Sequence, residues 1–128
     1  MSAHTILDYG ETGLPVDLEG LDITLLSPRF IPGLPDEDTA FQESAKNPIG
    51  TDALKNIVRA EETVAIVIPD ITRALPNERL LHWVFKELAH VRPENFTIIS
   101  GTGTHRENTP EEWIYMVGET IYNAYRCI

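Results

Sequence analysis

Two short runs dominated by apolar residues constrain this chain more than any other feature of its sequence. They are Val64 to Ile68 (VAIVI) and Phe96 to Ile99 (FTII). The first is continuously apolar, which, unlike an alternating pattern, is typical of a strand buried on both faces, as in a parallel sheet, and the second is predicted to be another buried strand. Between the runs lies a helical pattern whose apolar residues share one face: Leu81, Val84, Phe85 and Leu88. A strand, a helix and a second strand predict parallel pairing with a right-handed crossover.

Helix start and stop signals extend this pattern. Asn77 is expected to cap the helix between the two runs. Thr109 to Glu112 (TPEE) predicts the start of a last helix, because it combines proline at the first helical position with a Thr-x-x-Glu capping box. Gly118 is placed to end that helix, and Thr120 to Tyr125 suggests one more strand. The second half is therefore predicted to be an α/β, Rossmann-like β-α-β-α unit.

The N-terminal part is predicted to be a β-hairpin and strand region. Thr5 to Tyr9 and Leu14 to Leu18 are β-prone runs around two glycines, and Leu21 to Leu26 suggests a third strand. Residues 28 to 50 are rich in proline, glycine and acidic residues, as in a linker, and 36 to 46 suggest a short surface helix. The length of 128 residues nevertheless fits a single domain, 1–128.

Composition limits the classes of partner. The net charge is −10 and the acidic residues concentrate in the N-terminal half, which argues against nucleic acid but leaves an anionic small molecule possible near the later arginines. Cys127 is the single cysteine, so no disulfide framework is expected. No apolar stretch approaches the roughly 20 residues that span a bilayer. With no secretory pattern in the first residues, we expect a cytoplasmic location and no membrane partner.

The first candidate site loop follows the first apolar run. In sheets with parallel strands, ligands bind beyond the carboxyl ends of the strands. Arg73 can hold a carboxylate or phosphate through its two-pronged guanidinium group, Asp70 can orient a histidine or a ligand hydroxyl, and Thr72 can donate to an anion. The alternative is purely structural: an ion pair between Asp70 and Arg73, with the threonine fixing the turn.

The second candidate loop follows the second apolar run and reads Gly101-Thr102-Gly103-Thr104-His105-Arg106. Glycines between a strand and a helix can expose backbone N–H groups to an anion, although this spacing is not the dinucleotide-binding fingerprint. An imidazole can accept or donate a proton near neutral pH, so His105 is the candidate acid–base residue. The alternative is a structural histidine. His4, His82 and His90 suggest no site, and no metal ligands are expected within the chain.

Together, these loops resemble the N-terminal domain of the nickel-dependent lactate racemase family. The resemblance is carried by Asp70-Ile-Thr-Arg73, by Gly101 to Arg106 and by Asn108 to Glu112. It implies an isomerase that interconverts the enantiomers of 2-hydroxy acids such as lactate by proton-coupled hydride transfer. It also implies a cofactor, the nickel-pincer nucleotide, a pyridinium mononucleotide that carries nickel through carbon and sulfur.

The resemblance also assigns roles. His105 is expected to be one of two catalytic histidines that exchange a proton with the substrate hydroxyl, and Arg73 to bind the substrate carboxylate. Asp70 and Thr72 are expected to line the same pocket. From the glycine-loop argument, we expect Gly101, Thr102, Gly103 and Thr104 near the cofactor or substrate.

The family's second catalytic histidine, its cofactor-attaching lysine and its nickel-ligating histidine come later than the position of Ile128. A C-terminal domain or a second chain is therefore expected to complete the site, and the 128 residues alone are expected to be inactive. Two alternatives stay open. One is a non-catalytic module that binds a small carboxylate or phosphate, and the other is a structural or interaction protein.

Overall fold

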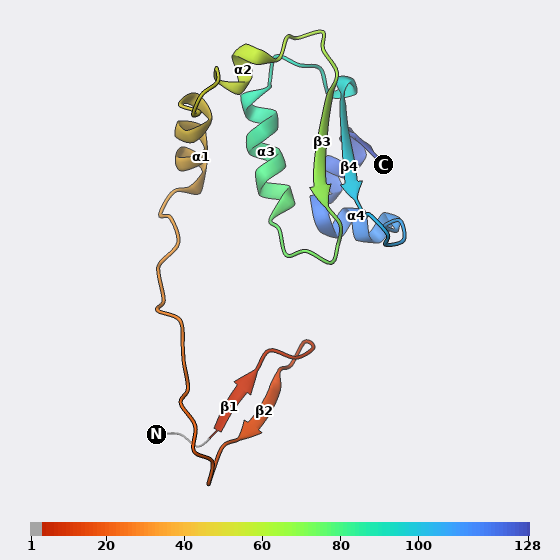
Figure 1. The fold of residues 1–128 in the computed structure, drawn as a ribbon. Helices are drawn as coiled ribbons and strands as arrows, with labels where there is room; N and C mark the ends of the chain where they lie inside the picture. Colours follow the sequence, from red (N-terminus) through yellow and green to blue (C-terminus); the bar gives the residue numbers. More distant parts are fainter. Residues whose placement is uncertain (1–3) are drawn as a thin grey trace. The chain divides into compact units, whose positions relative to one another are not determined.

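The computed structural model describes residues 4–128, which fall into two compact units divided between Gly33 and Leu34 (Figure 1). The boundary lies inside the stretch from 28 to 50 that composition marks as a linker. The organisation as one domain stays a prediction, and each unit is described by itself. No helix formed by residues 4–128 has the length and apolar character needed to cross a membrane.

The first unit contains the predicted hairpin. Strand β1 (His4–Leu7) pairs antiparallel with β2 (Leu14–Asp17). Gly13 lies in the turn with a φ of 75°, and its N–H donates to the Tyr9 carbonyl at 3.0 Å. The third strand predicted at Leu21 to Leu26 is wrong: this segment is exposed and irregular. An extended segment needs a partner strand for its backbone groups, and this two-stranded sheet does not extend to it.

The second unit confirms the α/β prediction. Its sheet has the order β3-β4-β5, and both strand pairs are parallel. The register places Val64 opposite Phe96 and Pro69 opposite Gly101, so β3 and β4 end together. The elements in chain order are α1 (Glu37–Lys46), α2 (Leu54–Ile57), β3 (Val64–Pro69), α3 (Asn77–Glu87), the 3-10 turn η1 (Pro93–Asn95), β4 (Phe96–Gly101), α4 (Pro110–Val117), α5 (Glu119–Ala124) and β5 (Arg126–Cys127).

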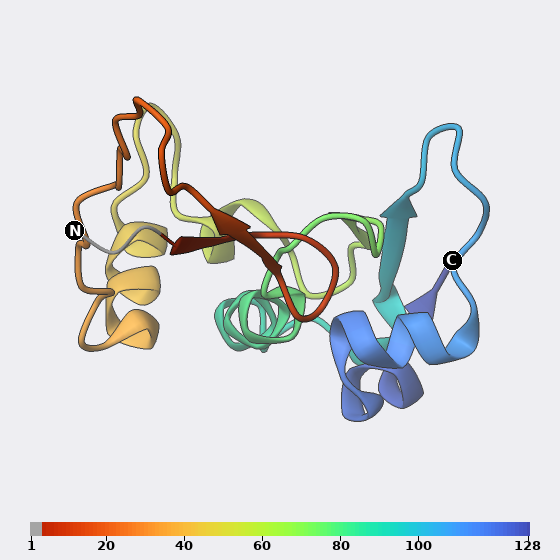
Figure 2. The ribbon, with the colours of Figure 1, turned by 90° about the horizontal axis from the view of Figure 1, so that it is seen from below.

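The core lies between the sheet and the helices α3, α4 and α5, which lie on one side of it (Figure 2). Ile68 and Ile98 point from the strands into a cluster formed with residues of these helices: Leu81, Trp113, Met116, Val117 and Ile121. The prediction that the first strand is buried on both faces is wrong, because burial alternates along β3 and the Val67 side chain is 68% exposed. The helices of residues 34–128 cover one face of the strand only.

Local signals set the ends of α4 as predicted. The Thr109 side chain accepts from the Glu112 N–H while the Glu112 side chain accepts from the Thr109 N–H, so the capping box is complete. Pro110 occupies the first turn, and Gly118, with a φ of 82°, ends the helix.

Two other local predictions are wrong. Pro76, not Asn77, is the N-cap of α3, and Asn77 lies inside the helix at 2% exposure. Residues 119–124 form helix α5 instead of a strand, and β5 begins only at Arg126. Packing overrides the β propensity of this segment, because a helical turn buries Ile121 in the core at 1% exposure.

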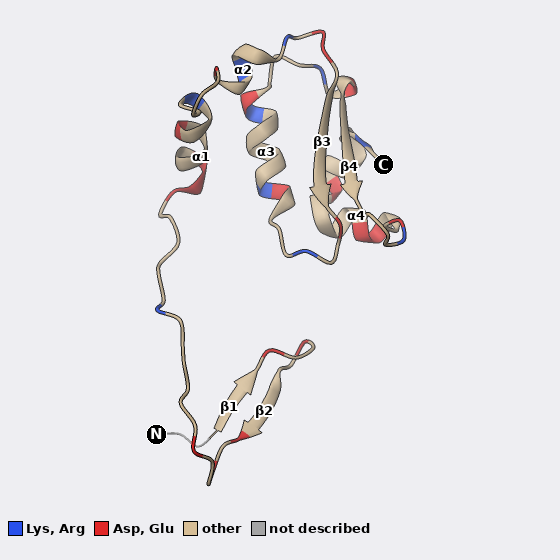
Figure 3. Cartoon of the chain, in the orientation of Figure 1, with Lys and Arg blue, Asp and Glu red and all other residues tan. Residues whose placement is uncertain are grey.

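Helix α1 is polar and packs beside α3, and both helices carry acidic and basic residues (Figure 3). Arg79 Nη1 lies 2.5 Å from Glu37 Oε2, and Lys86 Nζ lies 2.7 Å from Asp38 Oδ2. The rings of Phe41 and Trp83 add an apolar contact, with centroids 5.4 Å apart. The predicted surface helix is therefore confirmed, and its acidic first turn pairs with α3.

Gly118→Ala is expected to destabilise the protein by roughly 1–3 kcal/mol, because a φ of 82° with a ψ of 149° is a region that only glycine adopts readily. The free energy of unfolding, measured by urea titration, checks this. An added Cβ would also meet the flexible Glu78 side chain, so the substitution is repeated in a Glu78→Ala background. If Gly118→Ala leaves the free energy of unfolding unchanged in that background, the backbone argument is contradicted. Gly33→Ala, at a position with open space and no positive φ, is the control.

Candidate functional site

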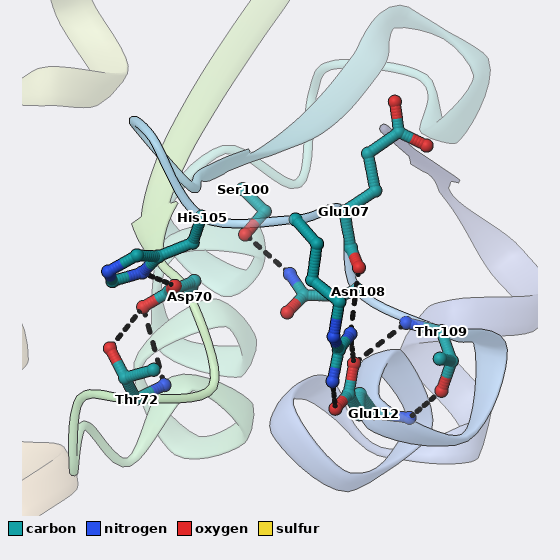
Figure 4. Close-up of polar contacts among 9 residues, drawn as sticks. Asp70, Thr72, Ser100, His105, Glu107, Asn108, Thr109 and Glu112 are labelled. Carbon is teal, nitrogen blue, oxygen red and sulfur yellow. Dashed lines mark hydrogen bonds and ion pairs between the residues drawn. The ribbon is translucent and has the colours of Figure 1, made fainter.

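The two candidate loops leave the same edge of the sheet. Because Pro69 pairs with Gly101, the residues that follow β3 and β4 start side by side. Figure 4 shows the result: Asp70 and Thr72 of the first loop lie against His105 of the second. Both loops therefore open on the same side of the sheet, and residues 35 positions apart in the sequence are in direct contact.

Asp70 is the centre of this contact. It is only 4% exposed, and its Oδ1 accepts from the Thr72 hydroxyl at 2.7 Å and from the Thr72 N–H at 3.3 Å. Its Oδ2 lies 2.5 Å from Nδ1 of His105. The Thr72 hydroxyl, followed by the His105 hydrogen bond, lowers the pKa of Asp70. Asp70 is therefore an ionised hydrogen-bond acceptor at neutral pH.

This acceptor determines the tautomer of His105. An ionised carboxylate only accepts hydrogen bonds, so the proton of the neutral imidazole sits on Nδ1 and is donated to Asp70. Nε2 then carries the lone pair. The side chain is 53% exposed, so a ligand can reach it. This arrangement equips His105 to accept a proton from a bound hydroxyl group and to return it.

Arg73 is held differently from its neighbours. Its backbone N–H donates to the Asp70 carbonyl at 3.1 Å, which closes the turn. Among the ion pairs found within residues 4–128, none joins Asp70 to Arg73, so the structural alternative considered for this loop is not the observed geometry. Arg73 instead lines a cavity of about 780 Å³ between the first loop, the start of α3 and α4. Other lining residues include Thr72, Asn77, Arg79, Tyr115 and Met116.

The glycine loop folds back on itself. The Thr102 N–H donates to the Ser100 carbonyl at 2.9 Å, and the His105 N–H donates to the Thr102 carbonyl at 3.0 Å. Gly103 has a φ of 60°, and a Cβ at Gly101 would lie 3.3 Å from the Ile68 carbonyl oxygen. The backbone N–H groups of Thr102 and His105 are thus used inside the turn and are not directed at an anion. A cofactor-binding role for residues 101–104 stays a prediction.

Within residues 4–128, no three side chains of the His, Cys, Asp and Glu types lie together as metal ligands.

Sequence reasoning missed the second half of this loop. Arg106 makes a two-pronged ion pair with Glu112, with Nη1 to Oε2 at 2.8 Å and Nη2 to Oε1 at 2.6 Å. Nη1 also donates to the Glu107 carbonyl at 2.9 Å. Asn108 Nδ2 donates to Ser100 Oγ at 2.7 Å. The available signal was the capping-box glutamate six residues after Arg106.

Arg106 also changes the acid strength of its partner. Its hydrogen bonds, followed by that of the Thr109 N–H, lower the pKa of Glu112 from 4.5 to about 2. The same pair raises the pKa of Arg106. Arg106, which sequence reasoning left available for an anionic ligand, is therefore already occupied by a carboxylate.

The geometry defines a class: an α/β protein with a carboxylate-oriented histidine at the carboxyl ends of two parallel strands, beside an arginine that faces a cavity. Comparison with known families then gives a direct match. Residues 9–128 match the lactate racemase N-terminal domain, and the chain belongs to that family.

Individual relatives agree. A lactate racemase from Lactiplantibacillus plantarum is 33% identical over 88 residues, and one from Thermoanaerobacterium thermosaccharolyticum is 28% identical over 86. These alignments cover 68% and 66% of this chain but only 21% and 20% of the relatives. The chain therefore spans about a fifth of the length of these curated relatives.

The fold has a counterpart among solved structures. The lactate racemase apoprotein from Thermoanaerobacterium thermosaccharolyticum matches with a TM-score of 0.66 at 24% identity. The match covers 98% of this chain and 30% of that one, and it establishes the shared fold.

The Glu112 carboxylate is expected to make stability sensitive to acid. Its pKa is lower in the folded chain than the ordinary 4.5, so its contribution is complete above pH 4.5 and is lost as pH falls toward about 2. The free energy of unfolding, measured by urea titration across this range, should fall more steeply in the wild type than in Glu112→Gln. Glu107→Gln is the control, because Glu107 contacts Arg106 through its backbone carbonyl. Parallel pH profiles for the wild type and Glu112→Gln would contradict the assignment.

Proposed function

We propose that this chain is the substrate-side part of a lactate racemase-like isomerase that acts on 2-hydroxy acids. The observation that carries the proposal is the 2.5 Å contact between His105 Nδ1 and Asp70 Oδ2, made beside Arg73 at the ends of β3 and β4. The relatives named lactate racemase support lactate, or a close 2-hydroxy acid, as the substrate.

The roles follow from the chemistry of each side chain. The Arg73 guanidinium binds the substrate carboxylate through two parallel hydrogen bonds and so fixes its orientation. Nε2 of His105 accepts the proton of the substrate hydroxyl group when the α-hydrogen leaves as hydride, and a proton returns to the oxygen when the hydride returns to the α-carbon from either face. Asp70 holds the imidazole in the required tautomer and stabilises its positive charge while the proton resides on it.

The cofactor belongs to this proposal. A nickel-pincer nucleotide supplies, when bound, the acceptor for the α-hydrogen as hydride. Gly101 to Thr104 fit a place beside such a group and not around its metal, because they offer backbone N–H and hydroxyl donors and contain no strong metal-ligating side chain. The protein ligand to nickel is assigned to polypeptide outside this chain.

The partners follow from the same reading. We assign the rest of the site to a C-terminal domain or a second chain, and we assign no nucleic acid or membrane partner. The proposed location is the cytoplasm, in keeping with a single cysteine. The alternative function is a binding module in which the same residues hold a small carboxylate or phosphate without chemistry.

The intact mass of the protein from its native source selects the material for the activity tests. A mass near 14.4 kDa means that a second polypeptide has to be purified with it, and a larger mass means that the longer chain is assayed. In either case the complete, cofactor-loaded protein is the species tested for interconversion of L- and D-lactate.

In that protein, His105→Ala is expected to lower the rate of racemisation by roughly 10²- to 10⁴-fold, the range typical of a lost acid–base residue, with lactate binding retained. Chiral chromatography of the products measures the rate. His82→Ala, which removes an exposed histidine from α3, is the matched control. Unchanged turnover in His105→Ala would remove its catalytic assignment. A wild-type protein that binds lactate without racemising it would establish the binding-module alternative.

Arg73→Ala is expected to raise the KM for lactate by roughly 10- to 100-fold, because hydrogen bonds to a charged group contribute about 1.5–3 kcal/mol. Steady-state kinetics at saturating and limiting lactate checks this. Arg79→Ala is the control: Arg79 lines the same cavity but is paired with Glu37, so its loss should leave KM nearly unchanged. Equal effects of the two substitutions would contradict a specific role for Arg73.

A further inference from the structure

We propose that Arg106 is a positioning residue that ties the second loop to helix α4 and thereby holds His105 against Asp70. The proposal rests on the proposed function, because it explains how the acid–base histidine is kept in place. It assigns Arg106 no contact with the substrate.

The tie runs from the core to the loop through a series of contacts. Trp113, Met116 and Val117 anchor α4 in the buried cluster. Glu112, in the first turn of this helix, accepts the Thr109 N–H at 2.8 Å (Figure 4). It also accepts from both terminal nitrogens of Arg106. Arg106 adjoins His105 in the sequence. One side-chain pair thus links the residue next to His105 to the core.

Apart from this pair, the loop is held by polar contacts: the His105–Asp70 contact, two backbone hydrogen bonds within the loop and one further side-chain bond. From Gly101 to Glu107, every residue except Thr102 is exposed, so apolar packing does not fix the backbone. Gly103, with a φ of 60°, has no side chain and so leaves the loop backbone conformationally free at that position. A second tie, the 2.7 Å bond from Asn108 to Ser100, fastens the end of the loop to β4. Arg106 is therefore the side-chain tie closest to His105 on the C-terminal side.

The geometry of the pair suits positioning better than stabilisation. The Arg106 side chain is 67% exposed, and exposed ion pairs contribute little to overall stability. A two-pronged guanidinium–carboxylate pair nevertheless fixes direction as well as distance. Because both terminal nitrogens are engaged, Arg106 is not a second carboxylate-binding arginine alongside Arg73. A displacement of about 1 Å at a catalytic group can lower a rate by roughly 10²-fold.

The deciding measurement is the tautomer of His105 in the 128-residue chain, read from the ring-nitrogen chemical shifts by NMR at a pH where imidazole is neutral. The wild type should show the proton on Nδ1. In Arg106→Ala this tautomer should give way to a mixture. Glu112→Gln should be intermediate, because glutamine still serves the capping box but loses the charge. Thr109→Ala is the matched control, since it weakens the cap and leaves the Arg106–Glu112 pair intact.

A wild-type tautomer in Arg106→Ala would overturn the proposal. So would an equal change in Thr109→Ala, because the effect would then come from a weakened helix. In the complete racemase, Arg106→Ala should lower kcat by roughly 10- to 100-fold with KM little changed, and Arg106→Lys should restore part of the loss. If the complete protein does not racemise lactate, the proposed function fails, while the tautomer still decides the role of Arg106.

Discussion

The parallel pairing of β3 with β4 is the constraint on which the site depends. Its register ends both strands at the same level, Pro69 opposite Gly101, so the next residues of each strand emerge as neighbours. Parallel strands need a crossover connection, and here it contains α3. The apolar face of α3 packs over both strands. A shift of the register would separate Asp70 from His105 and leave a buried carboxylate without its partner.

Two arginines on these loops have different roles because of the carboxylates within their reach. Arg106 faces Glu112, which the capping box already holds in place, so little further ordering is needed to form the pair. Arg73 follows Asp70 at a distance that would allow a pair, but the Asp70 oxygens are taken by Thr72 and His105. Both Asp70 oxygens are thus engaged by other partners, and Arg73 lines the cavity instead. One buried carboxylate thus orients the histidine and keeps the arginine free.

Sequence reasoning succeeded where the signal is local. The hairpin glycines, the capping box before α4 and the apolar runs of β3 and β4 each reflect the conformation of a few consecutive residues. It failed where distant packing decides. Residues 120 to 124 have strand propensity but form a helix that buries Ile121, and the exposed face of β3 depends on which helices cover the sheet. The predicted parallel topology put the loops of Asp70 and His105 at the same edge of the sheet. The hydrogen bond between these two residues and the Arg106–Glu112 pair depend on side-chain positions that no short sequence pattern encodes.

The exposure of His105 bears on how much of the proposed catalytic site this chain supplies. Its side chain is about half exposed, whereas proton and hydride transfers benefit from a site that excludes water. Asp70, which orients the imidazole, is buried at 4% exposure. The floor of the site is therefore formed by this chain, whereas the imidazole above it stays open to solvent. The short span of the match to full-length relatives agrees with this division. In the proposed function, the residues that hold and orient the acid–base group lie in this chain, and enclosing the substrate falls to groups beyond the two loops.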